Sequence, residues 1–496
     1  MSNPSQSAAG ASQAAVKTNE IADILGIEEE KKSEAQQTVG RLIEDIVSRT
    51  GGLVPANLRP QLKDRIAELD RRISDQVTEI LHDKSFQALE ATWRGLREMV
   101  FGATLEARTL EVKVMNISKD ELSQHFKDFP GAAWMQSPLY QKLYSEGLGI
   151  NGGDPVGMIV GDYEFDHSAD DVDTLRGMSK IAASCQAPFI SSVAPTLFGG
   201  AKSWHEVTRI PELKAVLSSP AHNRWNQLRN DTDSRYLGLT AVRALGRSPY
   251  GEGNKVDKMD FVERTDGKPE NYVWMNPAYL MARNVANAFS QYRWCAQIRG
   301  PNAGGKVEGL AQHVFQTREG LDEVVGTTEA AITNARSNEL SDLGLLPLEQ
   351  IKNSADAAFI SAQSFNLPVT YKGGAAGEES TANAALSARL PYTFAACRVI
   401  HYLKCIIRDR VGQPIEEDEI KVELQNWLND YVLPNPQNAS VELKAQKPIR
   451  EANIEVKPVP GNPGYYDIRV LLRPHFQLEG ANVDVALATQ VKQGGG

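Results

Sequence analysis

The sequence is poor in cysteine and offers no arrangement that would group the few cysteines it has. Only four occur in 496 residues, and no two of them form a CxxC pair. A secretory disulfide framework is therefore not indicated, and the thiols are expected to be reduced, as in the cytosol. The first fifteen residues also lack the basic and apolar regions of a signal peptide.

Long apolar runs and an excess of positive charge are missing too. The longest uncharged stretch, 181–201, contains prolines, serines and a Gly-Gly pair that would break and hydrate a membrane-spanning helix. The formal net charge of −10 disfavours a role in binding nucleic acid. The chain is expected to be cytoplasmic, with neither membrane insertion nor a nucleic-acid partner.

What is present is an alternation of helix and strand patterns. Apolar residues at helical spacing predict helices over 61–82 and 86–100. Leu110, Val112 and Val114 alternate with charged residues and predict a strand. This order favours an α/β fold with mixed α+β character, in which helices cover a sheet. Further strands are expected at 156–160, 189–193 and 236–243, and further helices at 170–184, 211–229 and 277–292.

Changes in composition divide the chain into five parts. The first part, residues 1–16, is rich in Ser, Ala and Gln and is expected to be disordered. The fourth part, KGGAAGEES at 372–380, consists of small and polar residues, which is typical of a boundary loop. The predicted parts are a tail at 1–16, a helical arm at 17–60, a central α/β domain at 61–371, the loop at 372–380, and a C-terminal domain at 381–496 with helices at 384–410 and 416–432 and strands at 453–457 and 466–472.

One acidic cluster could carry chemistry. A strand that ends in carboxylates can hold Mg²⁺, or Zn²⁺ together with a histidine. The favoured interpretation is that the cluster caps a helix and lines a solvated turn, because no second His or Cys lies at ligand spacing. A cytosolic α/β metal-dependent enzyme is kept as the alternative. The cluster comprises Asp162, Glu164, Asp166, His167, Asp170, Asp171 and Asp173.

The segment 272–300 contains no pair of residues that suits catalysis. It instead crowds aromatic side chains onto a helix that starts after Pro277, namely Trp274, Tyr279, Phe289, Tyr292 and Trp294. With three further motifs, PVGMIVGDYEFDH at 155–167, LSARLPY at 386–392 and RPHFQLE at 473–479, this segment resembles the large subunit of the type VI secretion contractile sheath, the VipB/TssC/EvpB family. The resemblance covers most of the chain from about residue 85 to 480. It implies a phage-tail-sheath-like structural subunit that is not an enzyme and has no cofactor.

The resemblance also implies partners. The large subunit forms an obligate heterodimer with a small sheath subunit, and the heterodimers build six-fold helical rings around an inner tube protein above a baseplate. Contraction propels the tube, and an AAA+ ATPase then recycles the sheath. A phage-tail or pyocin-like sheath, built from a single subunit type, is the nearest alternative.

Three sets of residues are candidate contacts. The segment 18–26 has Ile21, Ile24 and Leu25 at the spacing of a short helix that fits a groove, and is a candidate for ATPase docking or for packing on a helix at 39–47. The candidates for strand pairing between subunits are Tyr466, Ile468, Val470 and Leu472. The candidates for facing the inner tube are Glu416, Glu419, Glu423, Asp430, Arg408 and Arg410. No catalytic, cofactor-binding or metal-binding residue is predicted.

Overall fold

The computed structural model describes residues 37, 40–41, 58–104, 109–251, 253–257, 261–316, 319–320, 322–410, 413, 416–459 and 466–475. The chain forms two compact units, one made of Met1–Asp83 with Pro249–Thr265, the other of Lys84–Ser248 with Asp266–Gly496. Each unit is described by itself.

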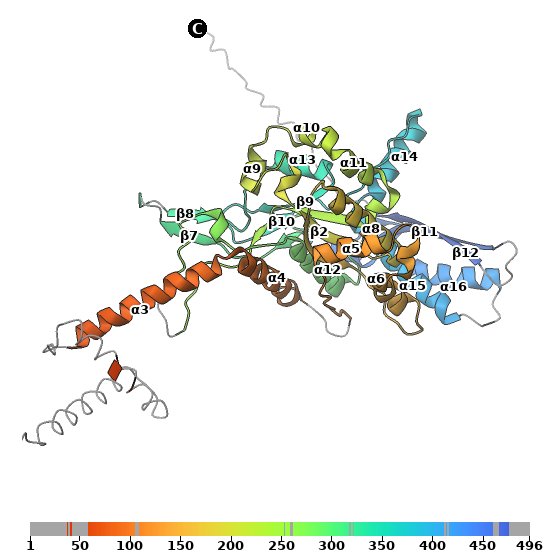
Figure 1. Ribbon diagram of the computed structural model, residues 1–496. Coiled ribbons are helices and arrows are strands. Elements are labelled where there is room, and N and C mark those ends of the chain that lie inside the picture. Colours follow the sequence, from red (N-terminus) through yellow and green to blue (C-terminus); the bar gives the residue numbers. More distant parts are fainter. Residues whose placement is uncertain are drawn as a thin grey trace, which may run out of the picture. The chain divides into compact units, whose positions relative to one another are not determined.

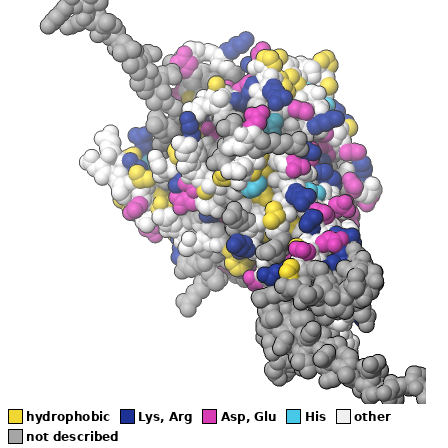
Figure 2. Space-filling view, turned by 90° about the vertical axis from the view of Figure 1, so that its left-hand side faces the viewer, with side chains coloured by type: hydrophobic (Ala, Val, Ile, Leu, Met, Phe, Trp, Pro, Cys, Tyr) yellow, Lys and Arg dark blue, Asp and Glu magenta, His cyan; other side chains and the backbone are white. Residues whose placement is uncertain are grey.

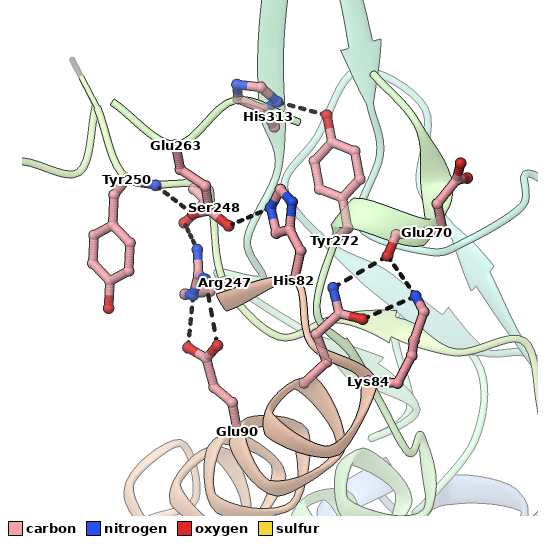
Figure 3. A network of polar contacts seen from close by, with 11 residues as sticks. His82, Lys84, Glu90, Arg247, Ser248, Tyr250, Glu263, Glu270, Tyr272 and His313 are labelled. Carbon is pink, nitrogen blue, oxygen red and sulfur yellow. Dashed lines mark hydrogen bonds and ion pairs between the residues drawn. The ribbon is translucent and has the colours of Figure 1, made fainter. Parts of the chain in front are cut away.

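The first unit contains one long helix, α3 (Leu58–Leu81), which confirms the helix predicted at 61–82. At its end, Nε2 of His82 lies 3.2 Å from the Glu263 carboxylate, and that carboxylate accepts the N–H of Tyr250 at 3.0 Å (Figure 3). Arg264 lies 3.6 Å from Asp75 of α3. The segment 249–265 is thus tied to the helix by polar contacts.

The second unit is built on a six-stranded mixed sheet (Figure 1). The first four strands in spatial order are parallel, and the last two run antiparallel to their neighbours. The predicted strands at 189–193 and 236–243 are confirmed. In spatial order the strands are β1 (Ile159–Phe165), β2 (Phe189–Val193), β3 (Leu237–Ala241), β9 (Leu345–Gln350), β10 (Ala357–Phe359) and β6 (Lys306–Val307).

The sheet separates two apolar cores because side chains alternate along each strand. Phe189 of β2 lies in the core that contains α8 (Ala169–Cys185), whereas its neighbour Ile190 lies in the core that contains α12 (Ala278–Tyr292). Every residue of β2 is buried. The arrangement is a sheet with helices on both faces, as the sequence predicts.

Local sequence signals explain where several helices begin. The side chains of Ser118 and Glu121 form a reciprocal capping box at α5 (Lys119–Asp128). Ser168 caps α8, which ends at Gln186 in the left-handed conformation. The remaining short elements of this unit are α6 (Pro138–Tyr140), α7 (Glu146–Leu148), α9 (Trp204–Arg209), α10 (Leu213–Leu217), α11 (Asn223–Asn230), α13 (Asn334–Asp342), α17 (Val441–Gln446), β4 (Ala244–Leu245), β5 (Trp274–Met275), β7 (His313–Gln316) and β8 (Asp322–Val325).

The C-terminal part has a small core of its own. α15 (Leu390–Arg410), α16 (Glu417–Asn429) and the antiparallel hairpin of β11 (Ile449–Pro458) and β12 (Tyr466–Pro474) surround it, and α16 lies against β11 (Figure 1). Leu424 and Leu428 of α16 and Trp294 from the aromatic segment are buried there. The predicted inward side of the 416–432 helix is confirmed at these two leucines.

Four expected elements differ from the structure. The strand expected at 156–160 is β1, 159–165, so Asp162 and Glu164 lie inside the strand and not on a turn. Residues 110–116 form no strand, because no described strand pairs with them. Residues 374–380, expected as loop, belong to α14 (Gly374–Ser387), and a break at Ala388 separates it from α15. The helix expected at 211–229 is interrupted at Pro220, which starts a separate turn.

Within the described residues, no helix combines the length and the apolar character needed to cross a membrane. The face shown in Figure 2 intermixes Lys and Arg with Asp and Glu side chains and has no large area of one sign.

Candidate assembly surfaces

The acidic cluster lies at the carboxyl end of β1, which in open α/β sheets is where ligands commonly bind. Here its carboxylates are held by the chain itself. Asp162 accepts from the Thr92 hydroxyl at 2.5 Å, and Asp171 binds the Lys119 ammonium at 2.7 Å. Asp173 lies 3.0 Å from Arg224. These acids diverge to separate partners instead of converging on one point.

A buried ion pair lies near the carboxyl end of β3. Arg243, two residues after β3, donates to the carboxylate of Glu329 at 2.7 Å, and Glu164 lies 3.7 Å from the same guanidinium. Glu329 is almost fully buried and also accepts the N–H of Trp204. Val242 precedes Arg243 at a φ of 69°, which a β-branched residue rarely adopts, so the surrounding packing must hold this turn.

In the part of the chain that the structure describes, no group of three or more His, Cys, Asp or Glu side chains could hold a metal ion. The His167 ring lies tilted against that of His222, with the ring centroids 4.3 Å apart. The structural interpretation is supported for Asp171, which is buried and accepts the backbone N–H of Asp166, but the N-cap of α8 is Ser168 and not Asp170 or Asp171. The metal-dependent enzyme is not supported.

The outer edge of β11 is partly occupied. The Gln425 side chain of α16 donates to the carbonyl of Ala452 at 3.2 Å and accepts the N–H of Ile454 at 3.0 Å. Next to it, the N–H of Leu433 donates to the carbonyl of Ile449 at 2.8 Å. These bonds occupy three of the outward backbone groups that an additional strand would need.

The outer edge of β12 is open. In an antiparallel ladder, pairs that exchange hydrogen bonds alternate with pairs whose backbone groups point outward. Ile454 directs its N–H outward to Gln425, so its partner Val470 also directs its N–H and C=O outward. Ile468 and Leu472 share this orientation. Among the described residues, no backbone group bonds to these three on the outer side.

The predicted strand candidates thus lie on one strand with one half-buried face. The side chains of Tyr466, Ile468, Val470 and Leu472 pack toward the C-terminal core, while the intervening side chains are exposed. The pattern of one buried face was predictable from period-two alternation. The pairing with β11 was not, because alternation along one strand does not indicate which other strand it pairs with.

The candidates for facing the inner tube are partly occupied. Glu416 and Glu419 form the capping box of α16, and Arg410 pairs with Glu423 at 2.5 Å. Asp430 ends the helix and is exposed. Arg408 is largely buried and donates to the carbonyls of Gly147, Ile150 and Gly153. Arg408 therefore binds the backbone of the segment 147–153 within its own chain.

The aromatic segment is a packing element. Trp294 contacts Tyr431, with ring centroids 5.2 Å apart, and the Arg398 guanidinium lies 4.9 Å from the Phe289 ring and 4.4 Å from the Tyr402 ring. These contacts join α12 and the residues after it to α15 and to the end of α16. The prediction that this segment serves packing is supported by its place between two cores.

Helix α4 (Lys84–Phe101) is anchored by a polar network that sequence reasoning did not detect (Figure 3). Arg247 donates to both carboxylate oxygens of Glu90, at 2.6 and 3.3 Å, and Lys84 donates to the carbonyl of Glu270 at 2.9 Å. Burial raises the pKa of Glu90, but the hydrogen bonds and charges of Arg247 and Arg94 outweigh this and hold the pKa below its usual value. These contacts join residues more than 150 positions apart, so no local sequence pattern predicts them.

The ATPase-docking candidates Ile21, Ile24 and Leu25 lie outside the described residues, as does most of the segment 39–47.

Comparisons with known proteins cover nearly the whole chain. The family model described as EvpB/VC_A0108, tail sheath N-terminal domain, matches residues 63–366, and the model described as EvpB/VC_A0108, tail sheath gpW/gp25-like domain, matches residues 379–491. The type VI secretion system sheath protein TssC1 of Pseudomonas aeruginosa is 42% identical over 480 residues, which covers 96% of this chain and 95% of that protein.

Two solved structures are more distant. A chain of the anti-feeding prophage baseplate matches with a TM-score of 0.36 and 9% identity, over 64% of this chain and 66% of that chain, just under two thirds of its length. A chain of the contracted anti-feeding prophage helical sheath matches with a TM-score of 0.32 and 9% identity, over 64% and 67%. Both scores lie below 0.5, too low to argue from.

Proposed function

We propose that this chain co-polymerises with a small sheath subunit around an inner tube. The proposal starts from the family: the chain belongs to the VipB/TssC family of type VI secretion sheath large subunits, which are structural proteins and not enzymes. In this proposal heterodimers stack as six-fold helical rings on a baseplate, contraction propels the tube, and an AAA+ ATPase recycles the contracted form. The energy of contraction is stored as strain when the sheath assembles, a kinetic form of stability.

The open edge of β12 is the observation that carries this proposal. An exposed strand edge pairs readily with a strand of another chain. Here Gln425 and Leu433 occupy part of the β11 edge, whereas the outward backbone groups of Ile468, Val470 and Leu472 on β12 have no partner among the described residues. A strand from a neighbouring subunit would pair with Ile468, Val470 and Leu472 and join successive subunits into a polymer.

The tube contact and the ATPase handle are further parts of the proposal. We place the polar side of α16, with Glu416, Glu419, Glu423 and Asp430, toward the inner tube, together with Arg410. Arg408 is not included, because its guanidinium is used within the chain. The handle for the ATPase would be Ile21, Ile24 and Leu25.

The domain division is also proposed. The central domain at 61–371 and the C-terminal domain at 381–496 correspond closely to the two matched family models, which leave residues 367–378 between them. Those residues end in the start of α14, so the boundary would be a short helix and not the loop expected at 372–380.

Expression with and without the small subunit tests the proposal. The chain alone is expected to aggregate or be degraded, and co-expression should give soluble heterodimers and tubules visible by negative-stain microscopy. Tubules from this chain alone would favour the phage-like sheath with one subunit type. A stable, monodisperse monomer that ignores the small subunit would contradict the proposal.

A further inference from the structure

Helix α4 presents an exposed apolar face. Phe86, Leu89 and Trp93 are 38%, 56% and 63% exposed. Surface side chains of this size are unusual when they stand together on one helix face, and they commonly mark a site of protein contact.

The spacing on this face is that of a coiled coil. Phe86, Leu89, Trp93, Leu96 and Val100 are separated by three, four, three and four residues, the a and d positions of a heptad repeat. The last two are half-buried against a small cluster around Met99, so the free part of the seam lies in the first half of the helix. A partner helix with the same spacing would fit along it.

The opposite face of α4 already holds the helix in its unit. A Cβ atom on Gly95 would collide with the Tyr279 ring, which shows how closely α4 and α12 approach. On the polar side, Glu90 is bound by Arg247 and Glu98 by Arg283. The exposed face is therefore not needed for docking α4, and it is presented by a firmly anchored helix (Figure 3).

Charge decides what kind of helix fits. Arg97 flanks the seam, is exposed, and makes no ion pair among the described residues. A second copy of α4 could not supply an acid, because Glu90 and Glu98 are both bound by arginines of their own chain. The exposed apolar area, roughly 300 Å² on the usual areas of aromatic side chains, is also well below the ~800 Å² per partner of a stable dimer. Two copies of this chain are therefore not expected to pair through this face alone.

We propose that α4 forms a two-helix coiled-coil contact with an amphipathic helix of the small sheath subunit, one with a matching heptad of apolar residues and an acidic residue opposite Arg97. This inference rests on the proposed function, since it takes the small subunit as the partner. Phe86, Leu89 and Trp93 then set the affinity, and Arg97 sets the register.

Site-specific photo-crosslinking tests the contact directly. A benzoylphenylalanine is placed at Leu89 in the full chain, which is co-expressed with the small subunit. The control position is Val314, 57% exposed on the β7–β8 hairpin. A crosslink to the small subunit is expected from position 89 and not from position 314. A crosslink from position 89 to a second copy of this chain would overturn the proposal.

A pair of substitutions gives an independent readout. Trp93→Glu should reduce co-purification of the small subunit by about tenfold or more, whereas Val314→Glu should leave it unchanged. Trp93→Ala is the milder variant, and circular dichroism confirms that each variant keeps its helices. Unchanged co-purification with Trp93→Glu overturns the inference alone. If the unmodified chain does not co-purify with the small subunit, the proposed function fails as well, so the two failures are distinguishable.

Discussion

The carboxyl edge of the central sheet and the outer edge of the β11–β12 hairpin differ in how they treat their polar groups. At the sheet, charged side chains are numerous but have partners within the chain, as with Arg243 and Glu329. At the hairpin, few charges are involved, yet a row of backbone groups around Val470 has no partner among the described residues. The acidic cluster at the sheet edge, which in the sequence resembles a catalytic or metal site, is bound within the chain. The outer edge of β12, which carries no such signal, is the edge with backbone groups available to another strand.

The largest expected effect separates the two edges of β12. Val470→Pro removes an N–H that points away from β11, so the hairpin and the heterodimer should survive while tubule assembly is lost. Leu471→Pro is the matched control: its N–H belongs to the ladder and its side chain is 59% exposed, so it should disrupt the hairpin itself. Negative-stain microscopy and amide exchange read out the difference. Normal tubules from Val470→Pro would show that the open edge is not used.

At the sheet edge, Glu329→Leu should destabilise the body and leave the assembly surfaces untouched. It leaves the Arg243 guanidinium with Glu164 alone, 3.7 Å away. The expected loss is about 3 kcal/mol in the free energy of unfolding of the heterodimer. Glu146→Gln, which removes an exposed i,i+4 pair with Lys142, should change it by less than about 0.5 kcal/mol. Equal effects of the two substitutions in denaturant titrations would argue against a structural role for the buried pair.

The pH dependence of stability tests the burial of His401 in α15. Burial lowers the pKa of His401 to about 4, from 6.5 in the unfolded chain. The unfolded state therefore binds the proton first, and stability should fall as pH drops from 6.5 toward 4, by about 1.4 kcal/mol per pH unit for this one group. His401→Gln should flatten this slope in thermal melts. His125, His222 and His475, whose pKa values are also lowered by burial, contribute to any slope that remains.

The smallest expected effect concerns the tube-facing side of α16. The double substitution Glu419→Gln with Glu423→Gln removes two negative charges. The side-chain oxygen at position 419 that accepts the N-cap backbone N–H of α16 is kept as the amide oxygen of Gln. Exposed ion pairs contribute about 0–1 kcal/mol each, so co-purification of the inner tube should fall modestly, and less so at high salt. Val422→Gln, a neutral change at an exposed position of the same helix, is the control. Unchanged tube recovery would place the contact elsewhere.

Much of the fold could be predicted from the sequence because its signals are local. The capping box at Ser118 and Glu121 predicts the start of α5, and the short uncharged run at 189–193 predicts β2. The strand expected at 110–114 does not form. Alternation shows only a preference for strand, whereas a strand also needs a partner to pair with, and no described strand pairs with this segment. The partner of β12 and the anchors of α4 were missed for a related reason: contacts such as Arg247 with Glu90 join residues far apart in the chain.

Residue-resolved amide hydrogen exchange across β12 tests the central claim most directly. In the unassembled heterodimer, the N–H groups of Arg469 and Leu471 should be protected by the hairpin, while those of Ile468, Val470 and Leu472 exchange freely. In assembled tubules, all five should be protected, because a strand from a neighbouring subunit now pairs with the outer edge. If the outward three exchange as freely in tubules as before assembly, β12 does not join subunits and the account is wrong.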